Sequence, residues 1–358
     1  MKQILLALSA VILIVGCSED APAPNTPAVY DATPFVLDAQ GLPAPVLPSD
    51  YPLTVQRVQL GRMLFHDKML SKDGSQSCAT CHQQKDGASD IRKFSIGVKG
   101  LPGGRQAMPV VNLAWHRRGF FWDGRAPTLR DQALRPIQDT LEMDETLPNV
   151  VIKLSASKMY RDQFVRAFNA DTITSALVGI ALEQFMLTMI SGNSTFDKVN
   201  RSEASFTEME ERGRKLFNTE FDPTGTVKGA ECFHCHAAPF FTNDRYMNNG
   251  LDNDASLKDL GRENVTSLAS DRARFKVPTL RNIAVTPPYM HDGRFTTLEE
   301  VVEHYNTGVR QSSTLDPLLQ FNVTPGLGLT QQDKADLVAF LKTLTDQTFL
   351  TNAAYSKP

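Results

Sequence analysis

The sequence predicts a mainly α-helical protein in which two domains of similar design follow one another along 358 residues. Apolar residues recur at helical spacing in several segments, and at most one or two short strands are expected. A five-residue motif and its flanking segments also occur twice, with offsets of 152 to 169 residues. Repetition at such a long period indicates duplicated domains and not a solenoid.

The repeated motif is Cys-x-x-Cys-His, at residues 78–82 and again at residues 232–236. This is the attachment signature of a c-type haem. Two thiols one helical turn apart can each form a thioether with a haem vinyl group, and the histidine that follows can ligate the iron. The predicted attachment residues are Cys78, Cys81, Cys232 and Cys235, with His82 and His236 as proximal ligands. We therefore expect two tandem c-type cytochrome domains, each with one covalently bound haem.

Zinc sites and thioredoxin-like motifs also use paired cysteines. Zinc ribbons separate their pairs by about 15–20 residues, whereas 154 positions separate Cys78 from Cys232. No βαβ pattern surrounds either pair, which argues against a thioredoxin-like motif. The fifth cysteine, Cys17, lies near the N-terminus, so no cysteine is left for a disulfide.

The first 16 residues are typical of an export signal, with a positive Lys2 before an apolar run at 4–15. The run is too short for a free-standing membrane anchor, which needs about 20 residues. Residues 14–17 resemble a bacterial lipobox, so cleavage would leave Cys17 to carry lipid, and Ser18 after it favours the outer membrane. Haem attachment outside the cytoplasm agrees with export, and we expect a lipid-anchored periplasmic protein.

Composition and repeats divide the chain into a signal peptide (1–16), a proline-rich tether (17–50) and domains at 51–195 and 196–350. The boundary is expected near 192–205, where Gly, Asn, Ser and Thr gather. Apolar spacing and a Thr207/Glu210 capping box predict individual helices. These span Thr54 to Phe65, Thr128 to Leu134, Thr174 to Met189, the stretch from Thr207 to Phe217, and Thr330 to Leu344.

The order of motifs resembles the bacterial di-haem cytochrome c peroxidases and their relative MauG, which matures methylamine dehydrogenase. The resemblance covers about residues 50–345 and rests on both haem motifs and five further segments, at 60–65, 121–126, 141–143, 275–282 and 288–293. It implies that the N-terminal haem reacts with peroxide and that the C-terminal haem relays electrons.

The resemblance also implies roles for three side chains near the first haem motif. Glu142 matches the family's distal glutamate, which moves a proton between the peroxide oxygens, and Gln132 matches the amide beside it. Trp122 matches the tryptophan placed between the haems. Without the resemblance, Glu142 would be interpreted as a solvated carboxylate, Gln132 as a surface amide and Trp122 as a core aromatic.

The two distal iron positions differ from each other. At the first haem, Val98 occupies the position of the distal histidine of many peroxidases, which implies a vacant sixth position, with Met108 as the rival ligand. At the second haem, Tyr305 stands where the peroxidases have methionine and MauG has tyrosine. His304, or plain packing of Tyr305, is the alternative. His291 is either a supporting group or a turn residue.

The family also holds calcium between its domains. Gln106 occupies the position of the asparagine ligand, and Thr286 and Pro288 match the backbone-carbonyl donors. Calcium accepts amide and carbonyl oxygens alike. The sequence is therefore compatible with a calcium site at these residues.

These features predict a peroxidase that reduces hydrogen peroxide with electrons from a c-type cytochrome or a cupredoxin. The alternatives are MauG-like oxidation of residues on a partner protein, and a di-haem electron carrier without catalysis. The net charge of −3 and the lack of a basic stripe argue against nucleic acid as a partner. A homodimer is a possible assembly.

Overall fold

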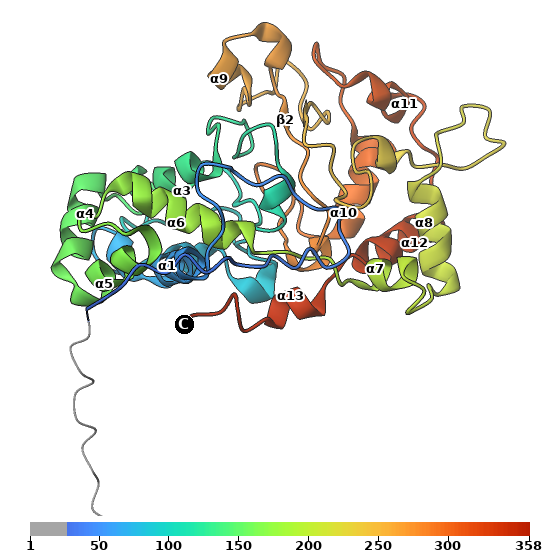
Figure 1. The fold of residues 1–358 in the computed structure, drawn as a ribbon. Coiled ribbons are helices and arrows are strands. Elements are labelled where there is room, and N and C mark those ends of the chain that lie inside the picture. Colours follow the sequence, from blue (N-terminus) through green and yellow to red (C-terminus); the bar gives the residue numbers. More distant parts are fainter. Residues whose placement is uncertain (1–26) are drawn as a thin grey trace, which may run out of the picture.

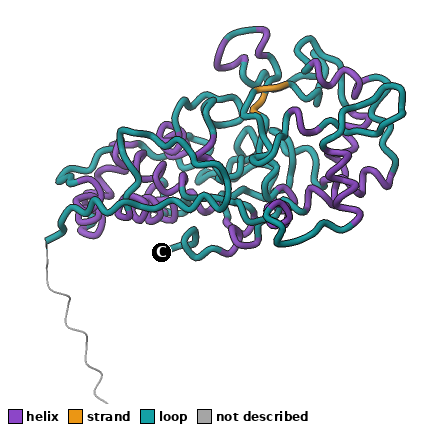
Figure 2. The backbone as a smooth tube through the Cα atoms, turned by 45° about the vertical axis from the view of Figure 1, so that its right-hand side comes forward, coloured by secondary structure: helices purple, strands orange, loops and turns teal. Residues whose placement is uncertain are grey.

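The computed structural model describes residues 27–358, so the predicted signal peptide and Cys17 lie outside the described residues. Helices and long connecting loops dominate the described chain (Figure 2), and its one strand pair is an antiparallel ladder of β1 (Tyr246–Met247) and β2 (Phe275–Lys276). The helices are α1 (Val55–His66), α2 (Cys78–Cys81), α3 (Leu129–Gln138), α4 (Leu147–Ala156), α5 (Lys158–Phe168), α6 (Ser175–Leu187), α7 (Thr195–Asn200), α8 (Glu208–Phe217), α9 (Glu263–Thr266), α10 (Leu298–Glu303), α11 (Gln320–Val323), α12 (Gln331–Lys342) and α13 (Gln347–Thr351). The predicted mainly α class is confirmed.

The predicted helices begin at residues whose side chains cap them. The hydroxyl groups of Thr54 and Thr174 accept hydrogen bonds from backbone N–H groups in the first turns of α1 and α6. The predicted capping box of Thr207 and Glu210 opens α8, and Thr330 with Asp333 forms a second one at α12. These helix predictions are confirmed, including that of α3.

Two helix pairs bring the duplicated Gly-Arg segments into equivalent surroundings. α1 packs on α6, and α8 packs on α12. A Cβ atom added to Gly61 would lie 1.9 Å from the carbonyl oxygen of Ala181, and one added to Gly213 would lie 1.9 Å from that of Asp336. Only glycine permits either approach, which explains why the same residue begins both repeated segments.

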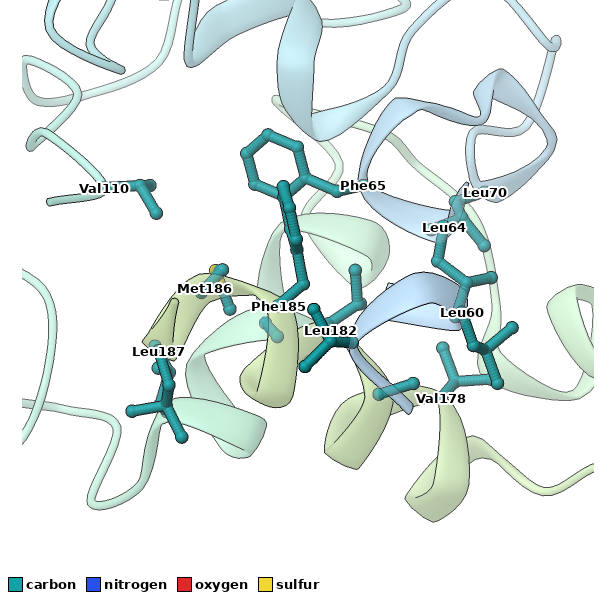
Figure 3. Close-up of a cluster of buried hydrophobic side chains, with 14 of the residues drawn as sticks. Leu60, Leu64, Phe65, Leu70, Val110, Val178, Leu182, Phe185, Met186 and Leu187 are labelled. Carbon is teal, nitrogen blue, oxygen red and sulfur yellow. The ribbon is translucent and has the colours of Figure 1, made fainter. Parts of the chain in front are cut away.

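The described residues contain two clusters of buried apolar side chains. The first draws mainly on residues 53–189, and Figure 3 shows how α1 and α6 contribute Leu60, Leu64 and Leu182 to it. The second draws on residues 196–344. In Figure 1 the helices of the first cluster occupy the left of the molecule, and α7, α8, α10 and α12 lie on the right. The predicted boundary region also contains α7, whose Phe196 packs in the second cluster.

The C-terminal segment returns to the first cluster, an arrangement that the sequence did not predict. Phe349 and Tyr355 are buried there, and the Tyr355 hydroxyl donates a hydrogen bond of 2.9 Å to the Thr188 carbonyl oxygen. The Arg62 guanidinium binds the carbonyl oxygens of Ala353 and Ser356. Figure 1 places the C-terminus below α1 and beside α13. None of the helices in residues 27–358 combines the length and the apolar character needed to cross a membrane.

Candidate functional site

The first haem motif forms part of the wall of a cavity of about 460 Å³. Cys78, Cys81 and His82 all line it, because α2 is a single turn that places the two thiols on one side. The Nδ1 atom of His82 bonds the Ala88 carbonyl oxygen at 3.0 Å. That bond orients the ring and leaves Nε2 for a metal in the cavity. Burial lowers the pKa of His82, which favours the neutral, ligating form.

Glu142 and Gln132 line the same cavity as His82. Burial, reinforced by the negative charge of Asp139, raises the pKa of the Glu142 carboxyl to about 7, and the positive charge of Arg125 opposes this shift. A carboxyl with such a pKa exchanges its proton near neutral pH. Gln132 reaches the cavity from α3. The structure therefore brings Glu142 and the Gln132 amide, which the resemblance places side by side, onto one cavity wall.

A close contact between loops holds Glu142 in place. The Glu142 backbone N–H donates to the Asp139 carbonyl oxygen at 3.0 Å, in the turn that follows α3. A Cβ atom on Gly97 would lie 2.1 Å from the Leu141 carbonyl oxygen, so the loop that follows the first haem motif packs directly on this turn. The Val98 N–H donates to the Glu142 carbonyl oxygen at 2.8 Å. Val98 thus supports the backbone of Glu142, and its side chain is not part of the cavity wall.

Other side chains with ligating atoms also line the first cavity, and two of them matter for the iron position. One is Met108, the rival ligand named from the sequence. The other is His116, which the sequence reasoning missed because an isolated histidine carries no motif. The Nδ1 atom of His116 lies 3.4 Å from an Asp244 carboxylate oxygen, and burial lowers the pKa of this histidine to about 4.

The second haem motif lines a separate cavity of about 200 Å³ with a mostly apolar wall. Cys232, Cys235 and His236 all contribute to that wall. The Nδ1 atom of His236 bonds the Phe241 carbonyl oxygen at 3.0 Å, which repeats the arrangement of His82. Burial lowers the pKa of His236 to about 4. Each motif therefore presents two thiols and one neutral imidazole to a cavity.

The candidate distal ligands at this second cavity lie in different surroundings. Tyr305 lines the cavity, and its hydroxyl oxygen accepts a hydrogen bond of 3.4 Å from the Asn249 amide. Burial raises the pKa of its phenol to about 12. His304 instead packs on Phe295, with its Nε2 atom 3.0 Å from the Asn249 carbonyl oxygen, and does not line the cavity.

The wall of the second cavity also contains Met247, Met290 and Asn249, to which the sequence gave no role. The Asn249 amide donates to the Met290 sulfur at 3.3 Å. His291 lines the cavity as well, stacked on Phe275 with ring centroids 3.6 Å apart. Met290 belongs to a segment quoted for the resemblance, but nothing in that segment distinguishes a methionine at a cavity wall from one in a core.

Trp122 belongs to the walls of both cavities. Its indole N–H donates to the Gln106 carbonyl oxygen at 2.7 Å, and its own carbonyl oxygen accepts from the Lys276 N–H at 2.6 Å. Lys276 also lines both cavities and forms a buried ion pair with Asp244. The indole therefore contributes to the walls of both cavities that the haem motifs line.

The three residues predicted to bind calcium line the second cavity together. Gln106 is buried, and its amide nitrogen donates to the Ser89 hydroxyl oxygen at 3.1 Å, while its backbone N–H bonds the His291 carbonyl oxygen. Thr286 and Pro288 are also buried. Within residues 27–358, no three His, Cys, Asp or Glu side chains gather into a metal site, so a cation here would depend on amide and carbonyl oxygens.

Both cavities fit a covalently attached haem by the chemistry of their walls. Each has a thiol pair for two thioethers and a histidine whose Nδ1 atom is already bonded, and each wall is largely apolar. The Glu142 carboxyl and the Gln132 amide line only the first cavity. The two cavities therefore share the groups that would hold a haem and differ in other polar side chains of their walls.

Sequence comparison agrees with this arrangement. A sequence model described as di-haem cytochrome c peroxidase matches residues 55–205. Because relatives at 33–38% identity also match over more than four fifths of the chain, the chain belongs to the di-haem cytochrome c peroxidase family. The family implies two c-type haems and oxidoreductase activity. The family predicted from the sequence motifs is confirmed.

Relatives come from both branches of the family. The methylamine utilization protein MauG of Methylorubrum extorquens is 38% identical over 301 residues, which cover 83% of this chain and 80% of that protein. MauG of Methylophilus methylotrophus is 33% identical over 306 residues, 85% of each chain. Cytochrome c551 peroxidase of Nitrosomonas europaea is 35% identical over 296 residues, 82% of this chain and 81% of that protein.

Two solved structures have a fold similar to that of this chain. The crystal structure of a MauG-like protein associated with microbial copper homeostasis has a TM-score of 0.80 at 33% identity, covering 88% of this chain and 97% of that chain. The diheme peroxidase BthA from Burkholderia thailandensis has a TM-score of 0.71 at 22% identity, covering 92% of this chain and 98% of that chain, and shares the fold.

Proposed function

We propose that the chain is a lipid-anchored periplasmic peroxidase that reduces hydrogen peroxide to water with electrons from a small donor protein, a c-type cytochrome or a cupredoxin. Family membership supports a peroxide substrate and a redox partner. The observation that carries the proposal is Glu142, which lines the cavity of His82 and has a pKa of about 7. A base in that position suits the handling of peroxide protons near neutral pH.

The reaction consumes one peroxide, two electrons and two protons and yields two water molecules. A haem in the first cavity would supply the iron that accepts peroxide and the redox change that breaks its O–O bond. The Glu142 carboxylate takes a proton from one peroxide oxygen and returns it to the other. The Gln132 amide, on the same wall, can donate a hydrogen bond that orients the peroxide.

Electrons enter by the second cavity and reach the first by way of Trp122. The indole lines both cavities and is fixed by its hydrogen bond to Gln106, which supports this path.

The two apolar clusters support a division into tandem cytochrome domains at 51–195 and 196–350. Gln106, Thr286 and Pro288 on one wall leave calcium as a candidate structural ion.

Glu142→Gln tests the proposal because it keeps the shape of the side chain and removes the base. In stopped-flow mixing of the holoprotein with peroxide, we expect the change in the haem absorption bands to slow by at least ~10²-fold. In the wild type that rate should rise with pH through about 7, because only the deprotonated carboxylate accepts a proton. Glu208→Gln, at an exposed position on α8, is the control and should react like the wild type. An unchanged rate in Glu142→Gln would remove the base from the mechanism.

MauG-like oxidation of residues on a partner protein is the second candidate. Tyr305, and not a methionine, occupies the predicted distal position at the second cavity and lines its wall. A phenolate stabilises oxidised iron more than a thioether does, which favours storage of oxidising equivalents. Turnover with a reduced cytochrome indicates the peroxidase. Peroxide-dependent modification of a co-purifying protein, without such turnover, indicates the alternative.

A further inference from the structure

A further pocket, open to solvent, also contacts Glu142. This outer recess has a volume of about 520 Å³ and lies beside α3, with Asp131, Arg135 and Gln138 exposed along its rim. Glu142 and Asp139 are both part of its wall. Neither Asp131 nor Arg135 reaches the first cavity, so the recess is a separate opening on the solvent side of the base.

A thin partition separates the outer recess from the first cavity. The residues common to both walls are Phe121, Arg125, Pro136, Asp139 and Glu142. Two of these five carry a carboxyl group, and both lie in the turn after α3, where the Glu142 N–H donates to the Asp139 carbonyl oxygen. Protons that cross this partition therefore have two adjacent acidic side chains available to them.

The Asp139 side chain is held in a fixed orientation at this boundary. Its Oδ1 atom accepts a hydrogen bond of 2.8 Å from the Leu141 N–H. The second oxygen, Oδ2, has no hydrogen-bond partner within residues 27–358, so it can bind water or a proton from the recess. Asp139 is half-buried, as is Glu142, while the rim residues beyond it are exposed.

Each peroxide that is reduced to water requires two protons from solvent. We propose that the outer recess is the entrance for these protons and that Asp139 passes them from the recess to Glu142. Asp139 acts through Glu142 and is a positioning and relay residue, not one that touches peroxide. This inference rests on the proposed peroxidase function and adds the path by which its protons arrive.

Other charged and titratable groups around the partition do not offer the same route. The neighbours are Arg125 in the partition, Asp131 and Arg135 from α3, Asp144 with its partners Lys72 and Lys99, and the thiols Cys78 and Cys81. Arginine stays protonated and cannot relay, and the thiols become thioethers when haem is attached. Asp144 is bonded to two lysines, at 2.8 Å from each.

Asp139→Asn in the holoprotein tests the relay, because the amide oxygen can keep the bond to Leu141 while the acid is lost. With ascorbate and a redox mediator as a saturating electron source, we expect turnover to fall by at least ~10-fold and the solvent deuterium isotope effect to increase. Formate, a small acid that can enter the recess, should restore part of the lost turnover. Asp139→Glu should retain turnover.

Asp131→Asn removes the same charge from the rim and should keep wild-type turnover and isotope effect. The relay is overturned if Asp139→Asn behaves like Asp131→Asn, or if its turnover falls with no change in the isotope effect and no rescue by formate. These outcomes leave the peroxidase proposal standing, because that proposal depends on the stopped-flow reaction with peroxide and its loss in Glu142→Gln.

Discussion

Tyr305 and His304 are neighbours in sequence, yet they face different surroundings. The Tyr305 phenol lies on the wall of the second cavity. The His304 ring does not line this cavity and instead bonds the Asn249 carbonyl oxygen. The sequence favoured Tyr305, because the resemblance implies a tyrosine at this position, and kept His304 as the alternative. The choice depends on the local path of a π-helical turn at His304–Gly308, which no apolar spacing predicts.

Replacing each of these side chains separately tests the predicted distal ligand. Tyr305→Phe removes the phenol oxygen and keeps the ring, so we expect it to change the visible spectrum and the reduction potential of the second haem. His304→Gln retains a donor for the Asn249 carbonyl oxygen and should leave both unchanged. If His304→Gln changes the spectrum and Tyr305→Phe does not, His304 is the ligand instead.

Some residues of the first cavity are marked by a sequence motif, and others are not. Glu142 and Gln132 were found because a family motif marks them, and the structure places both on the wall beside His82. His116 and Asp139 line the same wall without any motif. A lone histidine or aspartate in a sequence is indistinguishable from a surface residue, because its role depends on contacts made by distant loops.

Helices were predictable where local signals agreed with one another. Apolar residues at helical spacing predicted ranges that start at Thr54 and Thr174, and α1 and α6 each begin one residue later, with that threonine as the cap. β1 and β2 have two residues each, too few for an alternating pattern. Their pairing joins segments about 30 residues apart and is decided by tertiary contacts.

The close packing of α1 on α6 at Gly61 can be tested by mutation. Gly61→Ala places a methyl group against the Ala181 carbonyl oxygen on α6, so we expect it to lower the free energy of unfolding by about 1–3 kcal/mol. Gly104→Ala is the control, because its added Cβ atom meets nothing within 4 Å, and it should change stability by less than about 0.5 kcal/mol. Equal urea midpoints for the two variants would contradict the close packing of α1 on α6.

The whole molecule combines a repeated plan with contacts that the repeat does not explain. Both haem motifs, both Gly-Arg segments and both apolar clusters were expected from the duplication. The packing of Phe349 and Tyr355 in the first cluster was not, because no local pattern shows which cluster a segment at the end of a domain will join. Trp122 on both cavity walls likewise depends on how the two halves meet.

The two cavities differ in the side chains that line them. Glu142 and Gln132 line only the first, and Tyr305 lines only the second. The first haem is therefore expected to keep an open iron position for peroxide, and the second to be closed and to conduct electrons. A carrier without catalysis would have two closed centres.

EPR spectroscopy of the ferric holoprotein before and after peroxide tests this difference between the two haems. We predict one high-spin and one low-spin haem at rest, with the high-spin signal lost when peroxide is added. Two low-spin signals that peroxide leaves unchanged would contradict it.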